Sequence, residues 1–190
     1  IDGEFKFNNH PLFSSAQIIS GSDGYTLRLH LKSTGAFYGW NAENNSNGQL
    51  VFKFLNPPTI TEKNSLKGIK IVIDAGHGGK DPGAVSGSYT EKSIVLKVSN
   101  LVKQKLEAQG AKVKMTRTGD TYPSLPERVA FSKNNYAEIF VSIHVNAASS
   151  TAATGAETFY SVSTGDMYKE DIDLATFVNN QIVKNAEMKN

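Results

Sequence analysis

The stretch KIVIDAGHGG, residues 70–79, decides the fold class of this chain. Its first part, 70–75, is a short apolar run of strand length, and the glycine-rich Gly76-His77-Gly78-Gly79 ends that run. Downstream, residues 91–109 place their apolar side chains on one helical stripe, and residues 112–116 alternate as a second strand would. A strand, a helix and a strand in this order indicate an open, mostly parallel α/β sheet with flanking helices.

The rest of the second half continues this alternation. Ser124-Leu125-Pro126-Glu127 has the spacing of a capping box, with a proline that a first helical turn tolerates, so we expect a helix to begin there. Residues 138–145 and 156–161 have the pattern of a third and a fourth strand, and residues 172–186 carry apolar side chains at helical spacing. We therefore expect residues 69–190 to form the α/β domain.

The first half has a different pattern. Residues 25–32 alternate apolar and polar side chains, as a half-buried strand does, and residues 50–55 fit a further short strand. Asn56-Pro57-Pro58-Thr59 cannot continue a central strand, because proline lacks the ladder donor. The sequence therefore predicts a small all-β module at 1–58, joined to the α/β domain by a linker at 59–68.

The composition excludes several classes of protein. With 39% hydrophobic and 20% charged residues, the 190-residue chain has the composition of a soluble globular protein. A net charge of +2 is too slight a basic bias to predict nucleic-acid binding, and no stretch reaches the ~18 apolar residues of a transmembrane helix. Because the chain has no cysteine, any metal must be held by His, Asp or Glu.

Three residues of metal-binding type are expected at one edge of the sheet. His77 follows the first strand of the α/β domain, His144 lies near the end of the third, and Glu91 opens the intervening helix. Ligand sites of open α/β sheets form outside the carboxyl ends of the strands. Two imidazoles and one carboxylate make a zinc site with a fourth position open for water. The glycines around His77 leave space for a substrate, and the turn at 81–83 folds the loop back over this edge.

Each of the three residues also has a structural interpretation of its own. His77 fits a turn residue, Glu91 fits an acid at a helix N-terminus behind an N-cap at Thr90, and His144 fits a core histidine. The metal hypothesis is favoured only because all three point to one edge.

Six blocks of sequence carry a resemblance to a known family. They are IVIDAGHGGKDPGA, TEKSIVLKVSNLVKQKL, MTRTGD, SLPERVAFSKNN, IFVSIHVNA and GAETFY, in this order. From about Ile69 to at least Tyr160, this succession resembles the zinc-dependent N-acetylmuramoyl-L-alanine amidases of the Amidase_3 type.

The resemblance implies a site and a reaction. It makes His77, Glu91 and His144 the Zn²⁺ ligands. The implied substrate is peptidoglycan, cut at the amide between N-acetylmuramic acid and L-alanine by water whose pKa the zinc lowers to ~7. The resemblance also implies a secreted protein that acts in the cell wall or periplasm. Oligomeric state is not implied.

The general acid and base of the family has no counterpart in this chain. In the family it is a second glutamate on a late apolar strand. Glu157, Glu170 and Glu187 do not match that position, so we assign no catalytic residue and expect 69–190 to lack its C-terminal strand or strands. This leaves two alternatives open: a catalytically impaired zinc-fold module for wall binding or regulation, and a zinc hydrolase acting on another amide or ester.

Two further groups have a structural and a functional interpretation. Arg117 and Arg128 fall in blocks shared with the family, and a structural ion pair with Asp120 or Glu127 is the favoured interpretation. An aromatic cluster in the first half could stack on sugars, but a place in the core is favoured; its members are Trp40, Phe37 and Tyr38.

Overall fold

The computed structural model describes residues 3–32, 40–54, 65–148, 150, 152–161 and 168–186. The chain forms two compact units, Ile1–Val145 and Asn146–Asn190. The predicted domain bounds at 58 and 68 stay a prediction, because the proposed boundary at 56–59 and most of the linker lie outside the described residues.

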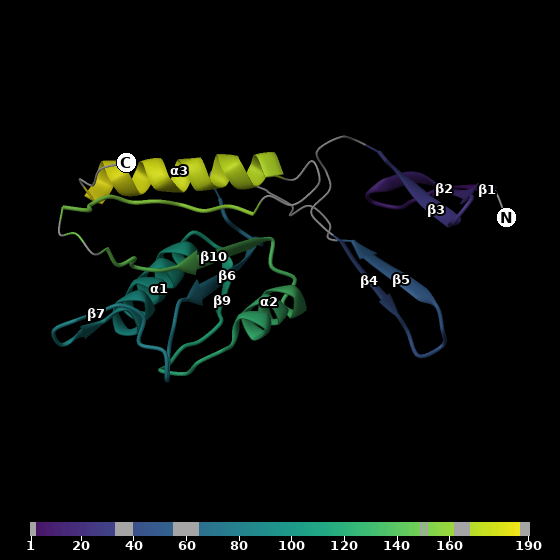
Figure 1. Ribbon diagram of the computed structural model, residues 1–190. Coiled ribbons are helices and arrows are strands. Elements are labelled where there is room, and N and C mark those ends of the chain that lie inside the picture. Colours follow the sequence, from purple (N-terminus) through teal and green to yellow (C-terminus); the bar gives the residue numbers. More distant parts are fainter. Residues whose placement is uncertain are drawn as a thin grey trace. The chain divides into compact units, whose positions relative to one another are not determined.

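A parallel sheet of three strands organises the second half of the first unit (Figure 1). Its strands are β6 (Lys70–Ala75), β9 (Lys112–Met115) and β10 (Ile139–Ile143), with β6 in the middle. In register, Ile139 pairs with Ile71 on one side of β6, and Val113 pairs with Ile71 on the other. The α/β class predicted from the sequence is confirmed, and the structure adds that the strand at 70–75 is the central one.

Helix α1 (Glu91–Ala108) lies along one face of this sheet (Figure 1). Its residue Val95 is fully buried, and Val102 and Leu106 pack against the core cluster. That cluster is built from one face of the strands and the segments before them: Ile69, Ile71, Ile73, Ala75, Ala111, Val113 and Met115. Burial of this apolar surface is the main force that fixes α1 on the sheet.

Helix α2 (Leu125–Asn134) begins as the sequence predicts. The Glu127 carboxylate accepts the Ser124 backbone N–H at 2.7 Å, which completes a capping box. Between β6 and α1 lies a short hairpin that the sequence pattern did not indicate, made of β7 (Val85–Ser86) and β8 (Tyr89–Thr90). Two-residue strands are too short to show a period, which explains why they were missed.

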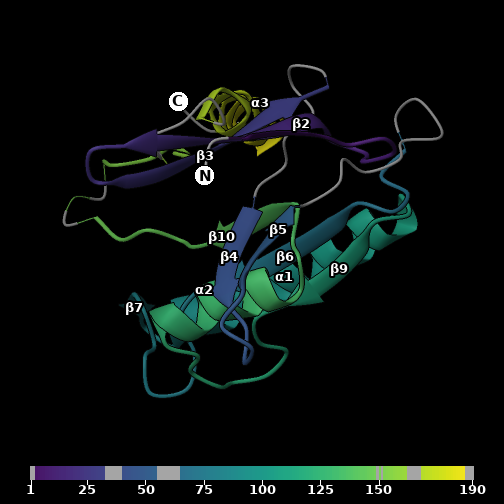
Figure 2. The same ribbon diagram turned by 90° about the vertical axis from the view of Figure 1, so that its right-hand side faces the viewer.

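The described strands of the first half pair antiparallel, which agrees with the all-β pattern predicted there. The meander β1–β2–β3 comprises Gly3–Lys6, Phe13–Gly21 and Gly24–Leu31, and its long β2–β3 pair is seen in Figure 2. A separate hairpin pairs β4 (Trp40–Asn44) with β5 (Leu50–Phe54). The strands β1, β2 and β4 were not predicted, because segments such as FSSAQIISG in β2 lack a regular alternation.

The described residues of the second unit form an extended segment followed by one long helix. Helix α3 (Tyr168–Ala186) confirms the helical spacing seen in the sequence. The strand predicted at 156–161 is wrong: within the described part of the chain, these residues have no ladder partner and form no strand. Instead, the Thr158 hydroxyl donates to Asn179 Oδ1 of α3 at 3.3 Å. Alternating apolar and polar residues predict an extended chain, but a β-strand also needs a neighbouring strand with which to form backbone hydrogen bonds.

None of the described helices has the length and apolar character needed to cross a membrane.

Candidate metal centre

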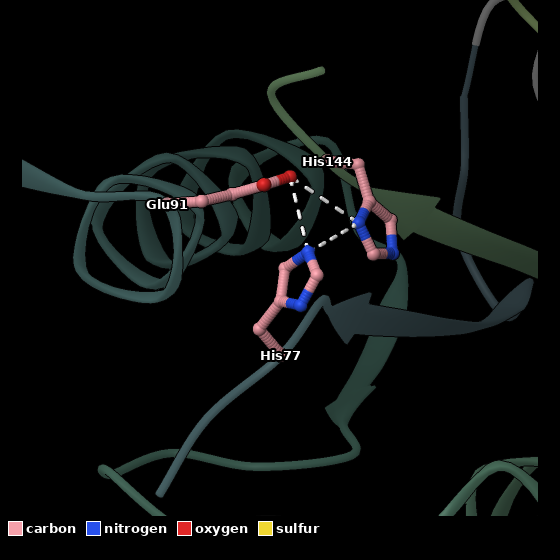
Figure 3. A group of neighbouring side chains, drawn as sticks. All are labelled: His77, Glu91 and His144. Atoms are coloured by element: carbon pink, nitrogen blue, oxygen red, sulfur yellow. Dashed lines mark hydrogen bonds and ion pairs between the residues drawn. The ribbon is translucent and has the colours of Figure 1, made fainter. Parts of the chain in front are cut away.

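Three elements that end or begin at the same edge of the sheet carry the candidate ligands. His77 lies in the loop directly after β6, and His144 directly follows β10, the parallel neighbour of β6. Glu91 is the first residue of α1. The structure brings the three side chains together, with one donor atom from each within 4.8 Å of the others (Figure 3).

The separations of the donor atoms fit one small cation. His77 Nε2 lies 3.2 Å from Glu91 Oε1 and 3.1 Å from His144 Nδ1, and His144 Nδ1 lies 3.4 Å from Glu91 Oε1. Ligands about 2.0–2.1 Å from a tetrahedral zinc ion lie about 3.3 Å from one another. The nitrogen and oxygen donor set is also one that zinc accepts, so the residues present fit the metal.

His77 is oriented by a carboxylate that the sequence analysis assigned only to a turn. Asp81 Oδ2 lies 2.8 Å from His77 Nδ1, and Asp81 Oδ1 accepts the Gly83 N–H at 3.0 Å. The hydrogen bond to His77, with that from Gly83, lowers the pKa of Asp81. Since an ionised carboxylate only accepts, Nδ1 carries the proton and Nε2 faces Glu91 and His144. Metal-ligating histidines are usually held in this way.

Glu91 is held as a buried carboxylate with 6% of its side chain exposed. Its Oε2 accepts the Ala84 N–H at 2.9 Å, and its Oε1 accepts the Val145 N–H at 2.7 Å. Burial raises the pKa of Glu91, but these hydrogen bonds and the attraction of the two histidines outweigh burial and lower it. Thr90 occupies the N-cap position without a capping hydrogen bond from its side chain. Glu91 is therefore engaged with the site rather than with the helix end alone.

His144 is not a core histidine, because 43% of its side chain is exposed. The ring of His144 occupies the space that a side chain at position 76 would need, since a Cβ at Gly76 would lie 2.4 Å from His144 Cε1. At Gly78, a Cβ would lie 2.0 Å from the Thr121 carbonyl oxygen. The prediction that these glycines leave space for a substrate is therefore wrong, since they let the protein pack against its own loop.

The family model of the N-acetylmuramoyl-L-alanine amidases, Amidase_3, matches residues 71–190. This chain belongs to the Amidase_3 family. Over 134 residues it is 39% identical to the N-acetylmuramoyl-L-alanine amidase LytC of Bacillus subtilis (strain 168), a stretch that covers 67% of this chain and 26% of LytC. The chain spans less than two thirds of the length of such curated relatives.

Solved structures agree with the family assignment. An N-acetylmuramoyl-L-alanine amidase from Clostridium difficile 630 has a TM-score of 0.58 at 35% identity and covers 67% of each chain. The amidase AmiC2 of Nostoc punctiforme has a TM-score of 0.57 at 35% identity, covering 64% of this chain and 66% of that one. The amidase resemblance drawn from the six blocks is thus confirmed.

The two family-block arginines are buried, but not in the predicted ion pairs. Arg128 pairs with Asp74 at 2.6 Å, and Arg117 has no carboxylate partner among the described residues. Asp120 pairs instead with Lys92 at 2.7 Å, while Glu127 caps α2. The sequence offered no signal for these choices, because the targets of the arginines are largely backbone carbonyls.

Among the described residues, the donor group includes none of the remaining candidates of this Amidase_3 chain. Trp40 is not a core residue, because it is 60% exposed; its ring lies 6.3 Å from that of Phe52, tilted by 43°. Phe37 and Tyr38 lie outside the described residues. Three glutamates do not match the acid or base position of the family. Glu157 is exposed and accepts from the Asn146 side chain, Glu170 lies in α3, and Glu187 lies outside the described residues.

Proposed function

We propose that this chain binds Zn²⁺ through His77, Glu91 and His144 and hydrolyses the amide between N-acetylmuramic acid and L-alanine of peptidoglycan. The observation that carries the proposal is the triangle of donor atoms with sides of 3.1, 3.2 and 3.4 Å at the carboxyl ends of β6 and β10. Membership of a family of N-acetylmuramoyl-L-alanine amidases supports the choice of substrate.

Zinc bound in a site with an open position supplies a Lewis acid and a water whose pKa is lowered to ~7. The chain's own residues prepare such a site. Glu91 contributes a negative charge that two backbone N–H groups hold in place. Asp81 fixes the tautomer of His77, so that Nε2 is free to donate its lone pair.

The centre is reachable from solvent on the histidine side. The side chains of His77 and His144 are 21% and 43% exposed, whereas that of Glu91 is 6% exposed. A substrate carbonyl can therefore approach past the imidazoles. No residue is proposed as general acid or base, because the candidate group contains no glutamate besides Glu91 among the described residues.

The proposed substrate sets the proposed location. Peptidoglycan lies outside the cytoplasm, so we propose that the protein acts in the cell wall or periplasm after secretion. A Staphylococcus aureus relative that is 42% identical over 102 residues is named a probable cell wall amidase, which supports this proposal.

The test measures new L-alanine N-termini released from purified peptidoglycan, in zinc and in a chelator. Because no general acid or base is assigned, and losing one typically costs ~10²- to 10⁴-fold in rate, we expect slow release. That release should depend on zinc and be lost in His144→Ala, while His30→Ala, a change at an exposed histidine of β3, retains it. If the wild-type chain binds zinc one to one and still releases no more L-alanine termini than the chelated sample, the chain is a zinc-fold module without amidase activity. Release of another amide or ester product would favour a different zinc hydrolase.

A further inference from the structure

Two buried guanidinium groups converge on three consecutive carbonyls at the end of β6. Arg117 donates from Nε to the Ala75 oxygen at 2.8 Å and from Nη2 to the Gly76 oxygen at 2.7 Å. Arg128 donates from Nη1 to the same Ala75 oxygen at 3.0 Å and from Nη2 to the His77 oxygen at 2.8 Å. The last of these carbonyls belongs to a candidate metal ligand.

The backbone that receives these bonds is irregular. His77 has φ of 58°, and Gly78 and Gly79 have φ of 123° and 53°, so three residues in a row lie in the left-handed region. A residue with a side chain is disfavoured there by about 1–2 kcal/mol. Such conformations persist when the surrounding structure determines them. In this loop the two guanidinium groups donate to the two carbonyls before the left-handed run and to the carbonyl of His77, its first residue.

Arg117 also reaches the helix that carries the second candidate ligand. Its Nη2 donates to the Lys92 carbonyl at 2.9 Å, one residue after Glu91 at the start of α1. Its Nη1 donates to the Gly119 carbonyl at 3.0 Å. One planar, rigid side chain therefore ties the His77 loop to the first turn of α1, which sets the separation of His77 and Glu91.

Asp74 extends the same network to the third ligand. Its Oδ1 accepts from Arg128 and from the Thr116 hydroxyl, each at 2.6 Å. Its Oδ2 accepts from the Ser142 hydroxyl of β10 at 2.7 Å, two residues before His144. The elements that carry all three candidate ligands are thus joined by one polar network, whose central members Asp74, Arg117 and Arg128 are buried.

Stability alone does not explain this network, because removing charged groups from water costs free energy. Arg117 is 3% exposed and has no carboxylate partner among the described residues, so its charge is solvated by carbonyl oxygens. Burial lowers the pKa of Arg117, and the nearby charge of Arg128 lowers it further. Buried ion pairs often give no net stability relative to apolar residues of similar volume. The arginines hydrogen-bond to each carbonyl and so fix its direction, which apolar residues cannot do.

We propose that Arg117 and Arg128 are positioning residues of the metal centre, which hold His77, Glu91 and His144 at the separations that zinc requires. The inference rests on the proposed zinc site and adds residues that do not touch the metal. It predicts that metal affinity, and not only stability, depends on the planar guanidinium groups.

The test compares Arg117→Lys and Arg128→Lys with Arg28→Lys, a change at an exposed arginine of β3. Lysine keeps the charge, but its ammonium cannot hold two carbonyls in fixed directions. We expect zinc Kd, measured by competition with a chelator, to rise ~10- to 100-fold in the first two variants, as for other residues that orient metal ligands. The absorption spectrum of the Co²⁺ form should also depart from that of the wild type. Arg28→Lys should change neither.

A second control separates positioning from stability. Val113→Ala removes buried volume from β9 without touching the carbonyls of 75–77, so it lowers Tm but should leave zinc Kd unchanged. Wild-type Kd and cobalt spectra in both buried-arginine variants would overturn the inference, as would a loss of affinity in Val113→Ala equal to theirs. Failure of the wild-type chain to bind zinc would instead overturn the proposed function, and the inference with it.

Discussion

Gly83 and Gly87 offer a matched pair of substitutions beside the candidate metal centre. Both residues have left-handed backbones, with φ of 64° and 57°. A Cβ at Gly83 would lie 2.6 Å from His77 Cδ2 and 2.8 Å from Glu91 Oε2, whereas a Cβ at Gly87 would meet nothing within 4 Å. The two alanine variants therefore share the backbone strain and differ in the collision with the candidate ligands.

The magnitudes follow from these distances. Alanine in a left-handed conformation costs roughly 1–2 kcal/mol, so both variants should lose a similar free energy of unfolding. In Gly83→Ala, carbon atoms that prefer separations of about 3.5–4.0 Å must also move apart by nearly 1 Å. Metal sites tolerate distance errors of only about 0.2 Å. We expect zinc Kd to rise at least ~10-fold, or about 1.4 kcal/mol, in Gly83→Ala alone.

The assay pairs zinc titration in a competing chelator with thermal unfolding of the metal-free proteins. Gly87→Ala should lower Tm by about 2–8 °C and keep the wild-type Kd. Gly83→Ala should lower Tm by at least as much and lose zinc affinity. Equal zinc Kd in the two variants would refute the argument that Gly83 is required by the packing of His77 and Glu91.

Three further predictions follow from single side chains. His77→Ala should abolish stoichiometric zinc in elemental analysis, and unchanged zinc content would remove His77 from the ligand set. Asp81→Ala should raise zinc Kd ~10- to 100-fold, whereas Asp81→Asn, whose amide oxygen can still accept from Nδ1, should recover part of that loss in the same titration. Burial raises the pKa of Asp74, but hydrogen bonds from hydroxyl groups and Arg128 outweigh it and lower the pKa below its usual 3.8. The ionised form therefore adds stability that is fully present above about pH 4 and is lost as pH falls through the lower, folded pKa. The free energy of chemical unfolding, measured at pH 2–6, should show this loss in the wild type. If its dependence on pH were the same in Asp74→Asn, the prediction would be contradicted.

The elements that the sequence predicted well are those with local signals. β6 matches its predicted bounds, 70–75, because an apolar run ends there in glycines. α1 and α2 begin where a helical stripe and a capping box place them. The convergence of candidate ligands was predicted from topology, since the carboxyl ends of neighbouring parallel strands meet at one edge. The prediction of a strand at 156–161 was wrong because strand pairing depends on an adjacent strand, which the alternation of side chains does not specify.

The partners of the buried arginines could not be predicted from residue types. Arg117 donates to backbone carbonyls in four different residues, Ala75, Gly76, Lys92 and Gly119. Every residue has a carbonyl, so a sequence cannot indicate which of them a guanidinium group will meet. Asp120 and Glu127 were the expected partners because they lie near the arginines along the chain. In the structure, Asp120 pairs with Lys92, and Glu127 accepts from Ser124.

Geometry favours the metal interpretation of His77, Glu91 and His144 over three unrelated structural roles. With the His77 proton on Nδ1 facing Asp81, Nε2 is an acceptor, and it lies 3.2 Å from Glu91 Oε1, which is also an acceptor. His144 Nδ1 approaches both atoms, at 3.1 and 3.4 Å. His77 Nε2 and Glu91 Oε1 repel each other as acceptors unless a proton on His144 Nδ1 or a cation lies between them. Separate roles as a turn residue, a helix-end acid and a core histidine do not require this approach. The proposed zinc ion would replace this repulsion with ligation to all three atoms, which is why the arrangement favours a metal over three separate roles.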